Sequence, residues 1–145
     1  MGTKTYSKKK DTKKNTKKNI KKSKYHICTL VETFLSMLDT IKLYHWNTRN
    51  YGEHLATDKI FQQLSENVDT FVETFLGKYP QRISGPLINI KIKSISIGSD
   101  TVFLQQMKTY QQYLQEMDKF STDLLNIRDE MLGNLNQLMY LFSLK

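Results

Sequence analysis

The sequence contains few of the residues that are typical of disulfide-rich proteins, of proteins with cysteine-based zinc sites or of membrane-spanning proteins. Its one cysteine, Cys28, excludes an internal disulfide framework and a cysteine-based zinc site. No apolar run approaches the roughly 18–20 residues that cross a bilayer. The lysine-rich start lacks the apolar stretch of a secretory signal. We therefore expect an intracellular protein in a reducing compartment, with no membrane span.

Residues that break helices are also scarce. The chain of 145 residues contains two prolines, Pro80 and Pro86, and six glycines. This length allows one domain with a sizeable hydrophobic core. The composition therefore favours a single domain built from long helices.

Acidic residues are almost missing from residues 1–24. This segment has eleven lysines and one acid, Asp11, a net charge of +10, whereas residues 25–145 have eleven basic and thirteen acidic residues, a net charge of −2. The formal net charge of +8 therefore describes a basic tail on a slightly acidic body. Such a polar segment cannot bury enough apolar surface to fold, so we expect residues 1–24 to be disordered.

The lysines of the tail predict contact with DNA phosphates, because such contact needs positive charge and no defined structure. Lysine acts as a point charge and does not read base edges as arginine does, so the predicted binding is non-specific. A solubilising arm and a nuclear-import signal are the alternative interpretations. The predicted DNA-binding residues are Lys4, Lys8, Lys9, Lys10, Lys13, Lys14, Lys17, Lys18, Lys21, Lys22 and Lys24.

From Tyr25 onward, apolar residues recur at steps of three and four, the spacing of amphipathic helices. The pattern predicts four helices, at about 25–47, 51–76, 100–118 and 122–143. Asn50 is the predicted N-cap of the second helix and Gly77 its end, while Gly133 predicts a close helix contact in the fourth. The predicted inward face of the second helix holds Leu55, Phe61, Leu64, Val68, Phe71, Val72 and Phe75.

The lengths of the connections predict the topology. Short turns after the first and third helices make each pair antiparallel. Residues 77–99 break the helical period and are long enough to run back along the bundle as an extended crossover. The second and third helices are therefore predicted to be parallel. The result is an all-α four-helix bundle over residues 25–145, in up-down-down-up order.

The second helix carries candidate metal ligands at its polar edge. His54 and Asp58 are four residues apart and share a face, and Asp69 and Glu73 repeat that spacing. His45, at the end of the first helix, lies across the short turn from His54. Imidazole and carboxylate groups together suit iron, zinc or manganese. The alternative interpretation is core or interface histidines beside a solvated row of carboxylates.

These five residues cannot meet within one chain. Asp58 and Asp69 are about 16 Å apart along a straight helix that rises ~1.5 Å per residue, whereas ligands lie about 2.0–2.2 Å from a metal. Two second helices packed antiparallel across a two-fold axis would bring one cluster to the other. The sequence therefore predicts a homodimer with two identical sites between its subunits.

The ligand spacing resembles that of the DNA-protecting mini-ferritins, the Dps family. The turn between the first two helices is three residues shorter than the family's. The composition is also similar to that of ferritin-like proteins of large DNA viruses. The resemblance rests on Tyr44-His45-Trp46-Asn47, on the spacing of His54, Asp58, Asp69 and Glu73, on Leu76-Gly77-Lys78-Tyr79-Pro80, and on Asp118 through Leu125.

The resemblance implies a ferritin-like bundle that is a ferroxidase. Peroxide or dioxygen would oxidise ferrous iron, and ferric oxide would collect inside a hollow homo-oligomer, which is at least a two-fold dimer and for which a dodecamer is one expected size. Zinc or manganese are the alternative metals. The implied location is the nucleoid or cytoplasm, or the virion or host cell for a viral member. Two irons would be held by His45, His54 and Asp58 of one chain and by Asp69 and Glu73 of its mate, beside Trp46.

Two further hypotheses stay open. In one, the bundle is only an assembly scaffold for a protein that condenses or packages DNA and has no ferroxidase activity. In the other, the protein is purely structural and its carboxylates form salt bridges between subunits.

Overall fold

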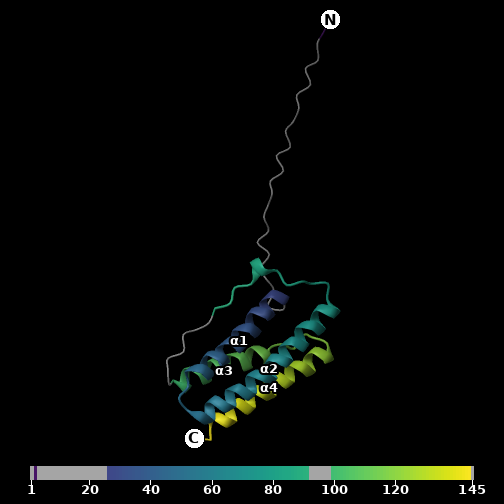
Figure 1. The fold of residues 1–145 in the computed structure, drawn as a ribbon. Coiled ribbons are helices and arrows are strands. Elements are labelled where there is room, and N and C mark those ends of the chain that lie inside the picture. The colour runs from purple at the N-terminus through teal and green to yellow at the C-terminus, as the bar shows by residue number, and fades with distance from the viewer. Residues whose placement is uncertain (1, 3–25, 92–98, 145) are drawn as a thin grey trace.

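Figure 1 shows the chain in a computed structural model, which describes residue 2, residues 26–91 and residues 99–144. The lysines of the predicted tail lie outside the described residues. The described residues form helices and no β-strand, which confirms the all-α class. The elements are α1 (Ile27–Asn47), α2 (Tyr51–Lys78), the short 3-10 helix η1 (Gly85–Leu87), α3 (Asp100–Gln115) and α4 (Thr122–Phe142).

The two ends of α2 follow from local chemistry. The Asn50 side chain accepts a hydrogen bond from the backbone N–H of Glu53 at 3.2 Å, which confirms the predicted N-cap. The predicted end at Gly77 is wrong, because α2 continues to Lys78. Tyr79 is the C-cap and has an extended backbone, since Pro80 disfavours a helical conformation in the residue before it.

The core forms where the apolar stripes of the four helices face one another. Phe34 of α1 meets Phe71 of α2 edge to face, with ring centroids 5.3 Å apart. Leu55 was predicted to point inward, but the residue is 51% exposed. Ala56 and Ile60 are buried instead, because the buried row of α2 runs through them at steps of four toward Leu64.

Contacts between helix ends establish the topology. The hydroxyl of Tyr44 at the end of α1 reaches Glu53 at the start of α2, so these helices are antiparallel. The Tyr44 ring also stacks on Phe103 at the start of α3, with centroids 4.1 Å apart. Lys78 at the end of α2 pairs with Asp123 at the start of α4. Helices α2 and α3 are therefore parallel, and the predicted up-down-down-up order is confirmed (Figure 1).

The structure also bears on the role of Gly133 and on the question of a membrane-spanning helix. Gly133 does not mark a close helix contact, since a Cβ atom there would meet nothing within 4 Å. Within the described residues, no helix combines the length and apolar character needed to cross a membrane.

Candidate metal centre

The turn between α1 and α2 brings the two candidate histidines together. His45 lies in the last turn of α1 and His54 in the first turn of α2, with only residues 48–50 between the helices. The two imidazole rings stack, with centroids 3.9 Å apart and planes inclined by 22°. His45 is buried, with 8% of its surface exposed, whereas His54 is exposed. The short turn therefore pairs one shielded imidazole with one that solvent reaches.

Each imidazole is held by the main chain of the opposite helix. Nδ1 of His45 lies 3.0 Å from the carbonyl oxygen of His54, and Nδ1 of His54 lies 3.1 Å from the carbonyl oxygen of His45. A carbonyl oxygen only accepts, so each Nδ1 donates, and each neutral ring then carries its free lone pair on Nε2. A hydrogen bond of this kind commonly orients the imidazole of a metal ligand. The pair thus presents two Nε2 atoms that are electronically ready to bind a metal.

Asp58 lies beside this pair and contacts two other side chains. Its Oδ1 atom is 3.9 Å from Nε2 of His45 and 3.6 Å from Nζ of Lys42. The Nε2 atom of Gln62 donates a hydrogen bond to Oδ2 of Asp58 at 3.3 Å. The Lys42 ammonium also lies 4.5 Å above the centre of the Phe61 ring. A metal bound by Asp58 must therefore displace Lys42 or share the carboxylate with it.

Asp69 and Glu73 lie farther along α2, on its exposed surface. A straight helix separates Asp58 from Asp69 by about 16 Å. Within residues 26–91 and 99–144, no three His, Cys, Asp or Glu side chains form a group that could hold a metal ion. One chain thus gathers His45, His54 and Asp58 as neighbours, without closing them into a ligand set, and leaves the other two carboxylates apart.

Trp46, the predicted site-lining residue, is 67% exposed at the end of α1. In the single chain its side chain is therefore open to solvent. A lining role for its indole therefore needs a second chain and stays a prediction.

An open groove of about 420 Å³ runs between α1 and α2 next to Asp69. Its walls are largely apolar, with Leu35 and Leu38 from α1 and Val72 from α2. Glu66 lines the same groove. An apolar strip with carboxylates along one wall is therefore exposed beside the incomplete ligand set.

A buried carboxylate holds the turn and was not predicted as part of the site. Glu53 accepts hydrogen bonds at Oε2 from the Tyr44 hydroxyl at 2.7 Å and from the Thr48 hydroxyl at 2.6 Å. Burial raises the pKa of the Tyr44 phenol, and the hydrogen bond to Glu53 and its negative charge raise it further. The phenol therefore stays protonated and donates. In the sequence, Glu53 is marked only by its position three residues after the N-cap residue Asn50. That position does not show that the Glu53 side chain turns inward.

The hydrogen bond between Tyr44 and Glu53 also fixes the positions of the two histidines relative to each other. Tyr44 directly precedes His45 in the chain, and Glu53 directly precedes His54. Each histidine therefore follows a residue whose side chain is clamped across the turn. The buried hydroxyl of Thr57 adds a contact, with Oγ1 3.3 Å from Nδ1 of His45.

Comparison with known proteins adds one relationship. The model of a protein family described as a family of unknown function (DUF5856) matches residues 45–142. The matched region begins at His45, includes all five candidate ligands and excludes the lysine-rich tail. No curated protein and no solved structure matches the chain. Because the family match covers most of its length, the chain belongs to the DUF5856 family.

Proposed function

We propose that this protein is a ferroxidase of the mini-ferritin type, with ferrous iron as its substrate. One observation carries the proposal. His45 and His54 stack beside Asp58, and each Nδ1 is bound to a carbonyl oxygen, so that both Nε2 lone pairs are free. Imidazole suits ferrous iron, and carboxylates suit the harder ferric ion that oxidation produces.

A second copy of the chain would complete the site. Asp69 and Glu73 are exposed carboxylates about 16 Å along α2 from Asp58. Two α2 helices packed antiparallel across a two-fold axis would carry them to the histidines of the mate. The apolar groove beside Asp69 supports such packing, because a second copy would cover its Leu35, Leu38 and Val72 walls.

The reaction balances with peroxide as the oxidant. Two ferrous ions each lose one electron, and one hydrogen peroxide takes both electrons and two protons to give two waters. The five candidate ligands bind the ions and stay bound to the ferric product. Their mixture of imidazole and carboxylate donors allows both oxidation states to be held.

The test measures iron and oxidation in the native assembly. Anaerobic loading with ferrous iron should give bound iron by mass spectrometry, and peroxide should then give ferric absorbance faster than in buffer. Asp58→Asn and Glu73→Gln should each abolish the acceleration, whereas Asp118→Asn, which removes an exposed carboxylate in the α3–α4 turn, should not. Wild-type oxidation no faster than buffer would reject the proposal.

Mixing the two inactive variants tests whether the site spans two chains. In a heterodimer of Asp58→Asn and Glu73→Gln chains, one site carries both defects and the other carries neither. Random reassociation should therefore restore about one quarter of the sites. No recovery in a mixture shown by mass spectrometry to contain heterodimers would reject a site shared between two chains.

The lysine-rich tail favours a second function, non-specific DNA binding. Residues 1–24 have a net charge of +10, while the rest of the chain has a net charge of −2. We propose that DNA binds the tail and that the bundle presents many tails on one particle. If iron oxidation is absent, the same tail on an inert assembly makes a DNA-condensing protein.

A further inference from the structure

Tyr51 and Leu55 are large apolar residues on the outside of α2, with 75% and 51% of their surface exposed. They begin a row of residues that continues along the helix to its last turn in alternating steps of four and three. This spacing is typical of the face through which one helix pairs with another. All members of the row, named the outer row below, are exposed or half-buried: Tyr51, Leu55, Asp58, Gln62, Ser65, Asp69, Val72 and Leu76.

The outer row is complementary to itself when one copy runs in the opposite direction. Apolar residues then meet at both ends of the row, and polar residues meet in the middle. A two-fold axis between two antiparallel helices produces this reversal. The residues that face each other are Tyr51 and Leu76, Leu55 and Val72, Asp58 and Asp69, and Gln62 and Ser65.

The charges of α2 also favour the antiparallel direction. Its second half, residues 64–76, has three acidic residues and no basic one. Its first half has two acidic residues, but Glu53 is buried and Asp58 lies 3.6 Å from Lys42 of α1. The first half also carries Lys59. Parallel pairing would bring the two acidic halves together, whereas antiparallel pairing brings each acidic half to the half with lysines nearby.

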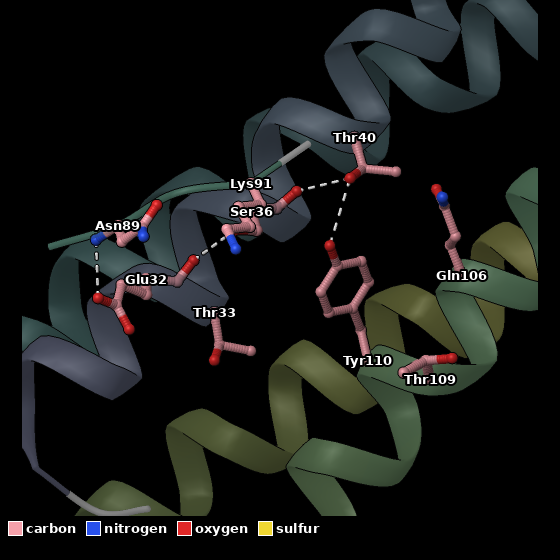
Figure 2. A pocket seen from close by; sticks show the side chains of 9 residues that line it. All are labelled: Glu32, Thr33, Ser36, Thr40, Asn89, Lys91, Gln106, Thr109 and Tyr110. Atoms are coloured by element: carbon pink, nitrogen blue, oxygen red, sulfur yellow. Dashed lines mark hydrogen bonds between the residues drawn. The ribbon is translucent and has the colours of Figure 1, made fainter. Parts of the chain in front are cut away.

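The groove between α1 and α2 leaves room for the apolar end of a second outer row. Val72 lines this open groove together with Leu35 and Leu38 of α1. The described part of the connector runs along a different face of α1, beside α3, where the Asn89 backbone N–H donates to Glu32 at 2.8 Å (Figure 2). The groove beside Val72 therefore stays accessible to another chain.

We propose that two copies of this chain pair through their outer rows, with Leu55 of each chain packed over Val72 in the groove of its mate. Burial there would remove the exposed apolar surface of Leu55 from water. The inference deepens the proposed function and rests on its antiparallel dimer, because the same register places Asp58 opposite Asp69 of the mate. The Lys42 ammonium, and the metal of the proposed function, would compensate these two charges.

Disulfide trapping in the full-length protein without iron tests the register. Cys28 is buried, so introduced cysteines are the accessible ones. Leu55→Cys chains mixed with Val72→Cys chains should form a linked dimer on mild oxidation. Neither variant alone should do so, because its two cysteines would lie about 25 Å apart along the pair at ~1.5 Å per residue.

Leu55→Cys mixed with Gln62→Cys is the matched control. Both cysteines then lie on the outer row but about 15 Å apart at ~1.5 Å per residue, too far for a disulfide. Linkage of Leu55→Cys with itself would overturn the proposal. So would a mixture of Leu55→Cys and Val72→Cys that links no better than the control.

A substitution at Leu55 tests its contribution to the dimer. Leu55 is exposed in the single chain, so Leu55→Ser should keep the helix content of the wild type by circular dichroism. It should weaken dimerisation at least about tenfold in analytical ultracentrifugation. Tyr140→Ser, which removes an exposed residue of α4 outside the outer row, should not. Unchanged dimerisation of folded Leu55→Ser would overturn the role of Leu55.

The trapping result and the iron assay fail separately. A linked dimer of Leu55→Cys and Val72→Cys without iron oxidation by the wild type would support the interface and reject the ferroxidase. Iron oxidation without this link would support the enzyme and overturn the register.

Discussion

Glu53 is a buried carboxylate in the first turn of α2 that accepts hydrogen bonds from the end of α1 and from the α1–α2 turn. A charge in such a place is tolerated only when hydrogen bonds compensate the lost hydration. Tyr44 and Thr48 provide two of these bonds, both to Oε2. The candidate site is therefore shaped partly by residues that are not among its candidate metal ligands.

Removing the Tyr44 hydroxyl tests this role. Tyr44→Phe should lower the free energy of unfolding by about 1.5–3 kcal/mol, because a buried carboxylate loses a donor. Urea denaturation of the two proteins measures the change. Tyr140→Phe is the control, since Tyr140 is largely exposed on α4 and should change stability by less than about 0.5 kcal/mol. Equal effects of the two substitutions would contradict the structural role of the Tyr44–Glu53 bond.

Lys42 offers a test of the metal site itself. Its ammonium lies 3.6 Å from Asp58 and would repel an incoming cation. Lys42→Gln should therefore tighten binding of cobalt, used as a spectroscopic probe of divalent metal, about fivefold. Lys59→Gln removes an equally charged but exposed group from α2 and should leave the affinity unchanged. Weaker cobalt binding in Lys42→Gln would mean that Lys42 supports the site.

Spacing along the sequence predicted which residues become neighbours only where the neighbours are local. His45, His54 and Asp58 are close because one short turn and one helical step connect them. The positions of Lys42 over Phe61 and of Tyr44 beside Glu53 depend on how α1 packs against α2. No periodicity within one helix contains that information.

At the scale of helices, the apolar period and the loop lengths were sufficient to predict four helices and their directions. One failure concerns two adjacent residues that compete for the buried face of α2, and another concerns where α2 ends. Leu55 and Ala56 are adjacent at the start of α2, and the smaller residue faces inward because it continues the row of Ile60 and Leu64. Gly77 permits a helix stop but does not impose one, whereas Pro80 does restrict the residue before it.

Gly133 offers a test at the same scale. It lies inside α4 on an exposed face, and a Cβ there would meet nothing within 4 Å. Gly133→Ala should therefore raise the free energy of unfolding by about 1 kcal/mol, because alanine loses less backbone entropy in a helix. Thermal unfolding followed by circular dichroism measures this.

Gly52→Ala provides the contrast. A Cβ at Gly52 would lie 3.3 Å from Oδ1 of Asn50, the atom that caps α2. The gain from helix propensity should then be lost to disturbance of the cap.

A destabilising effect of Gly133→Ala would contradict the exposure of this face of α4. It would indicate that another chain covers the face around Gly133.

The charge distribution of the whole molecule predicts which part of the chain binds DNA and how strongly that binding depends on salt. Deleting residues 2–24 should abolish gel retardation of any duplex, since the rest of the chain is slightly acidic. For the full chain with about 6–10 phosphate contacts, raising the salt from 50 to 200 mM should weaken binding by about three to five orders of magnitude. A tail of equal length with glutamine at every lysine is the control and should not retard DNA. Retardation that survives the deletion would exclude the tail as the binding element.

The crossover between α2 and α3 also has a consequence for folding kinetics. The α1–α2 and α3–α4 hairpins each close through short turns, while contact between the two hairpins must await closure of the longer connection. All five candidate ligands lie between His45 and Glu73, inside the first hairpin. We therefore expect the first half of the chain, as it leaves the ribosome, to form the stacked histidine pair before the second half has been synthesised.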